Sequence, residues 1–326
     1  MRIAKNTKTK VEQRIETIQN EIAAEVYKVG DALPSINSLS KSCDVSRDTV
    51  FKALNTLKEK GVLNSIHGKN YHVTSASHDV LLLLGEYSPF KEIFYKSFRE
   101  HLPLSYKVDL VFHQYNESFF NSIIEDAQGK FKRYIVMNYQ NEKFPEALKL
   151  LDPEKVLLLD FGNFDKGNYS YVCQDFDQNF YKVLKECATD ILKYKKLVYV
   201  LDSRQQHPQS SKHYFIQFCK DYELPYEIVD GIYKQDEIEE GSCYILVRQN
   251  DLVEIVRKGI KSSLKVGSDY GIIAYNEVHL YEILCNGITS FSVDWDEMGR
   301  LASEFVLKDV KIQRILPTLT YKRNSL

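Results

Sequence analysis

The chain has 326 residues, of which 44% are hydrophobic and 27% are charged. This composition is typical of a folded globular protein, and the length allows two or three domains. No stretch approaches the roughly 18 consecutive apolar residues of a membrane-spanning helix, and the opening residues MRIAKNTKTK have no apolar signal core. We therefore expect a cytoplasmic protein.

The first predicted element is a helix over 11–26, where apolar residues recur at helical spacing. A second helix follows Ser35, which is suited to cap it. Ser46 stands at the N-cap position of a third helix, Arg47–Lys60, whose buried stripe would be formed by Val50, Ala53, Leu54 and Leu57. Two short runs, 62–66 and 71–73, flank a glycine-containing turn and predict a hairpin. A helix that packs on one side and is polar on the other suits a DNA groove.

The segment from about residue 10 to 73 resembles the winged helix-turn-helix of GntR-type bacterial transcription regulators. The resemblance is carried by the approach GDALPS at 30–35, the run VSRDTV at 45–50, the turn GVL at 61–63 and the wing glycine at 68. It implies DNA contacts at Ser35, Ser46, Arg47, Thr49 and the wing residues Gly68 and Lys69. We add Asn37 on the second helix and Lys52 on the polar face of the third helix to the predicted surface. The chain departs from the family at Asn37, where an arginine is usual, and at Asn70, where a second wing glycine is usual.

Charge is divided unevenly along the chain. Residues 1–73 contain 12 lysines and arginines against 8 acidic residues, whereas the remainder contains 31 against 37. A basic head on an acidic body is typical of a DNA reader joined to a sensor of a neutral ligand. We expect a domain at 1–73, a small polar linker at 74–78 and an effector domain at 79–326. The partners predicted are double-stranded DNA and a second copy of the chain, in a homodimer.

After residue 79, apolar runs alternate with amphipathic helices. The unbroken run Val80–Leu84 is typical of a buried parallel strand, and the alternation of strand and helix predicts a doubly wound α/β sheet. The later predicted elements include helices at 144–151 and near 278–284, and a last strand near 315–320. The predicted fold class is α/β, with an N-terminal winged helix-turn-helix and a two-lobed parallel-sheet domain.

Parallel sheets bind ligands at the carboxyl ends of their strands. Polar and aromatic residues follow the predicted strands, and this mixture suits a sugar, because amides and carboxylates bond hydroxyl groups while rings cover the C–H faces. The candidate effector residues are Glu86, Tyr87, Phe90, Asn138, Tyr139, Asp160, Asp175, Arg204, Asn250, Asn276 and Asp294. The aspartates and asparagines among them, taken singly, are also suited to cap a helix or form a turn.

Residues from about 79 to the end resemble the ligand domain of LacI-type repressors, which is similar to periplasmic sugar-binding proteins. The motifs are SPF at 88–90, QD at 174–175, ND at 250–251, YNE at 275–277, MGRLA at 298–302 and LPTLTYKR at 316–323. The resemblance implies an effector site at Asn250 and Asn276, and a sugar such as fucose or arabinose as the effector of a carbohydrate-utilisation repressor.

Two other classes of function are open. The first is an enzyme, because some GntR-type readers are fused to an aminotransferase-like domain that uses pyridoxal phosphate. No lysine has a sequence context typical of that cofactor, and no GxxxxGK[ST] loop or GxSxG elbow occurs in the sequence, so we expect no cofactor. The six cysteines include no CxxC pair, so we expect no bound metal. Alternatively, the effector domain only dimerises, docks a protein partner or binds a metabolite that is not a sugar.

Overall fold

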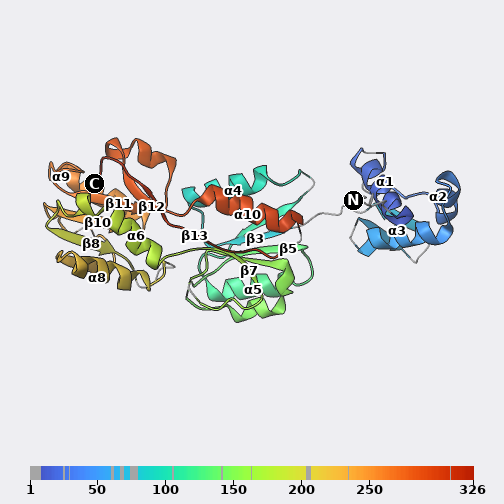
Figure 1. Cartoon of the computed structure of the whole chain (residues 1–326), viewed down its shortest axis with the longest axis horizontal. Coiled ribbons are helices and arrows are strands. Elements are labelled where there is room, and N and C mark those ends of the chain that lie inside the picture. The colour runs from blue at the N-terminus through green and yellow to red at the C-terminus, as the bar shows by residue number, and fades with distance from the viewer. Residues whose placement is uncertain are drawn as a thin grey trace, which may run out of the picture. The chain divides into compact units, whose positions relative to one another are not determined.

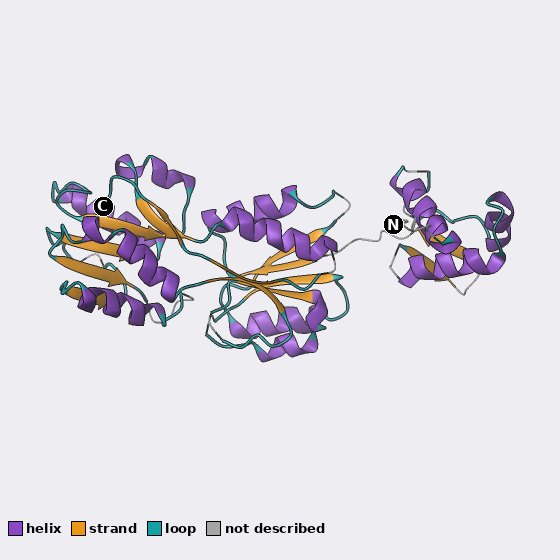
Figure 2. Cartoon of the chain, in the orientation of Figure 1, coloured by secondary structure: helices purple, strands orange, loops and turns teal. Residues whose placement is uncertain are grey.

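The computed structural model describes residues 9–24, 26–28, 30–59, 62–66, 70–73, 80–104, 106–140, 142–162, 164–202, 207–233, 235–308 and 310–326. The chain divides into two compact units, 1–79 and 80–326, which are drawn in Figure 1. Figure 2 shows that the second unit contains two sheets with helices packed on their faces. No described helix is long and apolar enough to cross a membrane.

The first unit is a three-helix domain with a hairpin. Its elements are α1 (Lys10–Ala23), α2 (Ile36–Ser42), α3 (Arg47–Glu59), β1 (Leu63–Ile66) and β2 (Asn70–Val73). The predicted stripe of α3 is confirmed, because Val50, Ala53, Leu54 and Leu57 are fully buried. β1 and β2 pair antiparallel, and the segment before α2 adds to them through the bond from Leu33 N to Tyr71 O.

The second unit consists of two lobes, each built on a six-stranded sheet. The N-lobe strands, in spatial order, are β13 (Gln313–Leu316), β7 (Ser170–Gln174), β6 (Val156–Leu159), β5 (Arg133–Met137), β3 (Val80–Leu84) and β4 (Val108–Phe112). The C-lobe strands are β14 (Leu319–Tyr321), β12 (Thr289–Ser292), β11 (Gly271–Tyr275), β10 (Ser242–Leu246), β8 (Lys196–Val200) and β9 (Tyr226–Val229). All neighbours pair parallel except β12 and β14.

Helices cover both faces of each sheet. In the N lobe, α4 (Pro89–Glu100) and α10 (Trp295–Lys308) pack side by side on one face and α5 (Glu117–Ala127) lies on the other, as Figure 1 shows. The C lobe has α6 (Gln178–Glu186), α7 (Ala188–Ile191), α8 (Ser211–Asp221) and α9 (Gln249–Lys261). The predicted α/β fold with two parallel-sheet lobes is confirmed.

The chain passes between the lobes three times, at β7–α6, β12–α10 and β13–β14. The third crossing corrects the prediction of a single strand near 315–320, since β13 and β14 belong to different sheets. Pro317 lies between them, and proline has no N–H to continue a ladder of hydrogen bonds.

Two predicted helices are 3₁₀ turns instead of α-helices. The segment predicted as a helix at 144–151 contains η1 (Glu146–Leu150), with η2 (Pro153–Lys155) close behind it. Pro145 and Pro153 bracket η1, so an α-helical ladder cannot extend in either direction. Near 278–284 the chain forms η3 (His279–Glu282) and η4 (Leu284–Asn286), because Cys285 has a positive φ of 51°.

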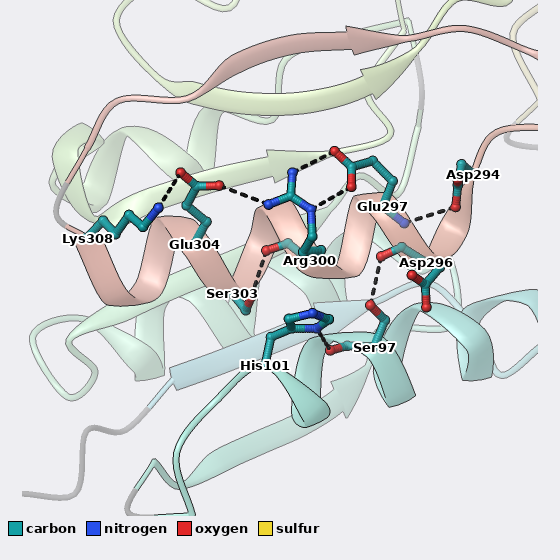
Figure 3. Close-up of polar contacts among 9 residues, drawn as sticks. All are labelled: Ser97, His101, Asp294, Asp296, Glu297, Arg300, Ser303, Glu304 and Lys308. Atoms are coloured by element: carbon teal, nitrogen blue, oxygen red, sulfur yellow. Dashed lines mark hydrogen bonds and ion pairs between the residues drawn. The ribbon is translucent and has the colours of Figure 1, made fainter.

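The close approach of α4 to α10 depends on Gly299. A Cβ atom at this position would lie 2.5 Å from the Phe94 carbonyl oxygen and 2.9 Å from the Phe98 nitrogen. Both are backbone atoms, which cannot move without shifting the helix. Ser97 Oγ also donates to the Asp296 carbonyl oxygen at 2.7 Å, which fixes the same contact (Figure 3).

We expect Gly299→Ala to lower the free energy of unfolding by about 1–3 kcal/mol, because the added methyl group overpacks a backbone contact. Urea unfolding monitored by circular dichroism measures the change. Leu307→Ala, on an exposed position of the same helix, is the matched control and should change stability little. Equal stability of Gly299→Ala and the wild type would contradict this account of the helix pair.

Candidate DNA-binding surface and effector site

Ser46 caps the helix predicted to read DNA. Its Oγ accepts a hydrogen bond from Thr49 N at 3.1 Å and lies 2.8 Å from Thr49 Oγ1. Ser35 caps α2 in the same way, through the bond from Ser38 N at 3.2 Å. Each serine hydroxyl therefore fixes the start of a helix and remains on the exposed surface.

The outer faces of α2 and α3 carry the other predicted contacts. Asn37, Arg47 and Lys52 are exposed, and Lys52 Nζ lies 2.8 Å from Asp48 Oδ2. An exposed i,i+4 pair of this kind is weak, so a phosphate group can displace the carboxylate at little cost. Arg47 stands in the first helical turn, with its guanidinium on the exposed surface.

Side-chain hydrogen bonds hold the hairpin against α3. Lys58 Nζ donates to Ser65 Oγ at 2.8 Å, and Tyr71 OH donates to Asn55 Oδ1 at 2.9 Å. The predicted wing residues Gly68 and Lys69 lie outside the described residues.

Three predicted effector residues follow β3. Glu86 and Tyr87 are exposed, and the Tyr87 hydroxyl donates to Glu92 Oε2 at 2.5 Å. Phe90 is half-buried and packs against the cores of both lobes. Its ring lies 4.9 Å from that of Trp295, the only tryptophan of the sequence, at the start of α10. Phe90 therefore connects α4 to the second crossing and to the C lobe.

A buried lysine lies beside these residues. Lys91, in the first turn of α4, is 4% exposed, and its Nζ donates to Glu86 O at 3.0 Å and Tyr115 OH at 2.8 Å. Burial lowers the pKa of Lys91 to about 8, opposed by the nearby charges of Glu86 and Asp160. The ammonium group remains the dominant form at neutral pH.

Asp160 is the first residue after β6 and has a positive φ of 53°. Its Oδ1 is inaccessible to solvent and has no hydrogen-bond partner among the described residues. Burial raises the pKa of Asp160 to about 6, and the Lys91 charge opposes this rise. Such an unsatisfied carboxylate oxygen is rare in folded proteins and marks a place for a ligand or water.

Asn138 and Tyr139 follow β5, and their side chains form hydrogen bonds with nearby groups of the protein. Asn138 is fully buried, donates through Nδ2 to Lys143 O at 2.8 Å and accepts from Gln140 N at 3.3 Å. The Tyr139 hydroxyl donates to Glu117 Oε1 at 2.7 Å. For Asn138 the turn-forming role, which the sequence left as the alternative, is the one the hydrogen bonds favour.

The first crossing is held by a buried hydrogen-bond network. Gln174 Nε2 donates to Tyr275 OH at 2.7 Å and to Thr318 Oγ1 at 3.0 Å, and Thr318 Oγ1 donates to Asp175 O at 3.0 Å. The Asp175 carboxylate accepts from Asp177 N and from Asn179 Nδ2, both at 2.8 Å. Asp175 thus organises the entry to α6 and borders a cavity of about 160 Å³ at this crossing.

The predicted residues of the C lobe and of the second crossing lie in different settings. Asn276 is half-buried with a positive φ of 67°, directly after β11, whereas Asn250 is exposed on the first turn of α9. Arg204 lies outside the described residues. Asp294, which the sequence assigned to the effector site, caps α10 by accepting from Glu297 N at 2.9 Å (Figure 3).

An arginine that the sequence analysis left out of the site occupies the C-lobe edge. Arg248 follows β10 and forms a bidentate pair with Asp251, at 2.6 Å from Nε and 3.0 Å from Nη2. Its Nη1 also lies 3.5 Å from Asp202 Oδ2, after β8. Through these two pairs, Arg248 joins the loop after β8 to the start of α9.

Lys91 and Tyr115 were also not among the predicted site residues. A signal was present for Lys91: it stands at i, with Phe94 and Phe98 at i+3 and i+7, on the apolar stripe of α4. A lysine at a core position is unusual and indicates a special role. No sequence pattern predicted Tyr115, which follows β4 with a positive φ of 55°.

The N-terminal unit has sequence relatives of known class. Residues 9–73 match the model of the family described as bacterial regulatory proteins, gntR family. These residues form a helix-turn-helix domain of that family, and the chain is a DNA-binding transcription regulator. A search of curated proteins found no significant match to the sequence.

The second unit has the fold of LacI-type regulators and periplasmic binding proteins. A periplasmic binding protein/LacI transcriptional regulator from Alkaliphilus metalliredigens, complexed with D-xylulofuranose, aligns with TM-score 0.62 and 12% identity over 76% of this chain and 99% of its own. The Escherichia coli trehalose repressor aligns with TM-score 0.62 and 12% identity over 75% and 100%. A LacI family regulator from Lactobacillus casei with bound glucose aligns with TM-score 0.64 and 13% identity, over 76% of this chain and 99% of its own.

Two buried histidines predict a loss of stability in acid. Burial lowers the pKa of His113 to about 4 and that of His207 to about 3, from 6.5. Below about pH 6.5 the unfolded chain therefore takes up protons that the folded chain does not. This lowers the free energy of unfolding by up to about 1.4 kcal/mol per histidine for each pH unit. Asp160, with its raised pKa, acts in the opposite direction below about pH 6.

We expect the free energy of unfolding to fall as the pH falls from about 6.5 to about 5, and His207→Phe to reduce this dependence. Denaturant unfolding at several pH values measures the slope. His279→Phe, at an exposed position of η3, should retain the wild-type slope. A His207→Phe slope equal to that of the wild type would show that His207 is not buried in its neutral form.

Proposed function

We propose that this protein is a repressor of a carbohydrate-utilisation operon, controlled by a monosaccharide effector bound between the two lobes. In this proposal, residues 1–73 bind operator DNA, 74–78 are the linker and 79–326 bind the effector. Fucose and arabinose are the first sugars to test. The protein acts in the cytoplasm as a homodimer and carries out no catalysis.

The observation that carries the proposal is the joining of the lobes at the carboxyl ends of their strands. Gln174 ends β7 and Tyr275 ends β11, and their side chains are bonded. In the loops after β5 and β8, Glu142 Oε1 accepts from Ser210 N at 3.0 Å. Parallel sheets bind ligands at this edge. Asp160 Oδ1, a buried acceptor without a described partner, lies in the same region.

The solved relatives support a sugar as the ligand. Two of them contain D-xylulofuranose or glucose, and the third is named as a trehalose repressor. A ligand that binds one lobe arrangement better than another shifts the populations toward it, and operator affinity changes if the two arrangements space a pair of readers differently.

Exposed apolar side chains on the C lobe support the homodimer. Val253 and Ile260 are seven residues apart on α9 and so lie on one helix face, and Leu280 in η3 and Ile283 directly after η3 are also exposed. Exposed apolar side chains are also what the alternative function requires, in which the second unit docks a protein partner without an effector. A screen for ligands separates the two.

Trp295 provides the reporter for that screen. It is 3% exposed and lies between the second crossing and Phe90, which contacts both lobes. We expect a monosaccharide effector to change the emission of the full-length protein when tryptophan alone is excited, because closure of the lobes alters the packing around this ring. The matched control is Trp295→Phe, which should bind the same sugar in a thermal-shift assay without the signal. Failure of every sugar to change either reading would contradict the sugar effector and favour the docking alternative.

For the DNA-binding surface, we expect Arg47→Ala to weaken operator binding by about 1–3 kcal/mol and to reduce the salt dependence by about one phosphate contact. Fluorescence anisotropy with the best duplex selected from a random pool, at several salt concentrations, measures both. Lys149→Ala removes an exposed lysine from the second unit and should have little effect. Wild-type affinity and salt slope for Arg47→Ala would exclude Arg47 from the DNA surface.

A further inference from the structure

Lys91 has one more donor than its neighbours use. The ammonium group carries three N–H donors, and the described residues accept two of them, at Glu86 O and Tyr115 OH. The rings of Phe90 and Tyr115 lie beside it, with centroids 5.5 Å and 5.2 Å from Nζ. At 4% exposure, Lys91 has little water available for its third donor.

Asp160, conversely, has a carboxylate oxygen that lacks a hydrogen-bond donor. Its backbone is fixed by the bond from Asp160 N to Val172 O at 2.9 Å, so the carboxylate is held at the end of β6. Oδ1 is inaccessible to solvent and has no hydrogen-bond partner among the described residues. A buried carboxylate oxygen in this state lacks a hydroxyl or N–H donor.

The two groups lie at the same edge of the N-lobe sheet but are not directly bonded. Lys91 Nζ is bonded to the Glu86 carbonyl oxygen just after β3, and Asp160 directly follows β6, with only β5 between these two strands. Nevertheless, no ion pair within 4.0 Å joins Lys91 to Asp160 in the described part of the chain, although many other pairs form there. A buried ammonium donor and a buried carboxylate oxygen that both lack a partner are costly, so a polar group is expected to bridge them.

The bridging group must both accept and donate. It accepts from the third N–H of Lys91 and donates to Asp160 Oδ1. A hydroxyl does both, whereas an ionised carboxylate or phosphate only accepts. A carboxylate or phosphate group of the ligand at this position would satisfy Lys91 but would leave Asp160 without a donor and would be repelled by Asp160 and by Glu86.

We propose that Lys91 and Asp160 bind adjacent hydroxyl groups of the effector and that they select a neutral polyhydroxyl compound over sugar acids and sugar phosphates. This inference rests on the proposed function, because it assumes that the effector binds between the lobes. It assigns Lys91 as a specificity-determining residue, Asp160 as its acceptor partner and Tyr115 as the residue that positions Lys91.

The test compares matched ligands by isothermal titration calorimetry on the full-length protein. The probes are galactose with galacturonate, glucose with glucose 6-phosphate, and fucose and arabinose as further neutral sugars. We expect a neutral member to bind and its charged partner to bind at least about 100-fold more weakly. We also expect Lys91→Met and Asp160→Asn each to weaken binding of the neutral sugar by about 10-fold or more.

Lys258→Met is the control. Lys258 is a half-buried lysine in the last turn of α9, and its Nζ also donates to a backbone carbonyl, that of Asp236. The Lys258→Met variant should bind the neutral sugar with wild-type affinity. Asp160→Asn provides a second variant should Lys91→Met fail to fold.

The outcomes separate the two proposals. Binding of a charged member as tightly as its neutral partner would overturn the selectivity while leaving the sugar effector in place. Wild-type affinity of both Lys91→Met and Asp160→Asn would overturn the assignment of the pair, with water alone as the bridge. If no sugar of either kind binds, the proposed function is contradicted and this inference falls with it.

Discussion

The arrangement of the second unit depends on one buried side-chain amide. Gln174 ends β7 at the first crossing, and its Nε2 bonds both Tyr275, at the end of a C-lobe strand, and Thr318, at the third crossing. Hydrogen bonds of this kind are strong in a low-dielectric interior and costly to leave unmade. Through Thr318 and Asp175 the two crossings are bonded to each other, which restricts the lobes to motions that keep this network intact.

The candidate site is built around that restriction. The strand ends bring Asp160 and Asn276 to the edge where the lobes meet, each in a left-handed backbone conformation. Such conformations cost energy in residues other than glycine, although aspartate and asparagine tolerate them best. Phe90 and Trp295 occupy the second crossing beside the same edge. A ligand bound there, as proposed, would contact groups of both lobes at once, and lobe closure could therefore respond to its presence.

Much of the fold could be predicted from local patterns. Runs such as Val80–Leu84 became strands with the expected limits, because a strand buried on both faces needs unbroken apolar character. Ser46 and Ser35 became N-caps for equally local reasons. The prediction near 315–320 was wrong because membership of a sheet depends on pairing with distant strands, which periodicity does not encode.

The site was less accessible to sequence reasoning. The choice of residues that follow predicted strands included Asp160 and Asn276, which do lie at the strand ends. The same choice included Asp294, which caps α10, and Asn138, whose side chain is bonded within its own loop. Turn formation and ligand binding use the same residue types, so spacing alone cannot separate them. The role of Gln174 depends on Tyr275 and Thr318, which are more than 100 residues away in the sequence.

The central claim is that a ligand held between the lobes controls DNA binding by the first unit. The most direct measurement is the affinity of the full-length protein for its selected duplex, by fluorescence anisotropy at fixed salt, with and without a saturating sugar. Coupling of about 1–3 kcal/mol, typical of allosteric proteins, predicts a change in affinity of roughly 5- to 150-fold. An unchanged affinity in the presence of a sugar that demonstrably binds would contradict the claim.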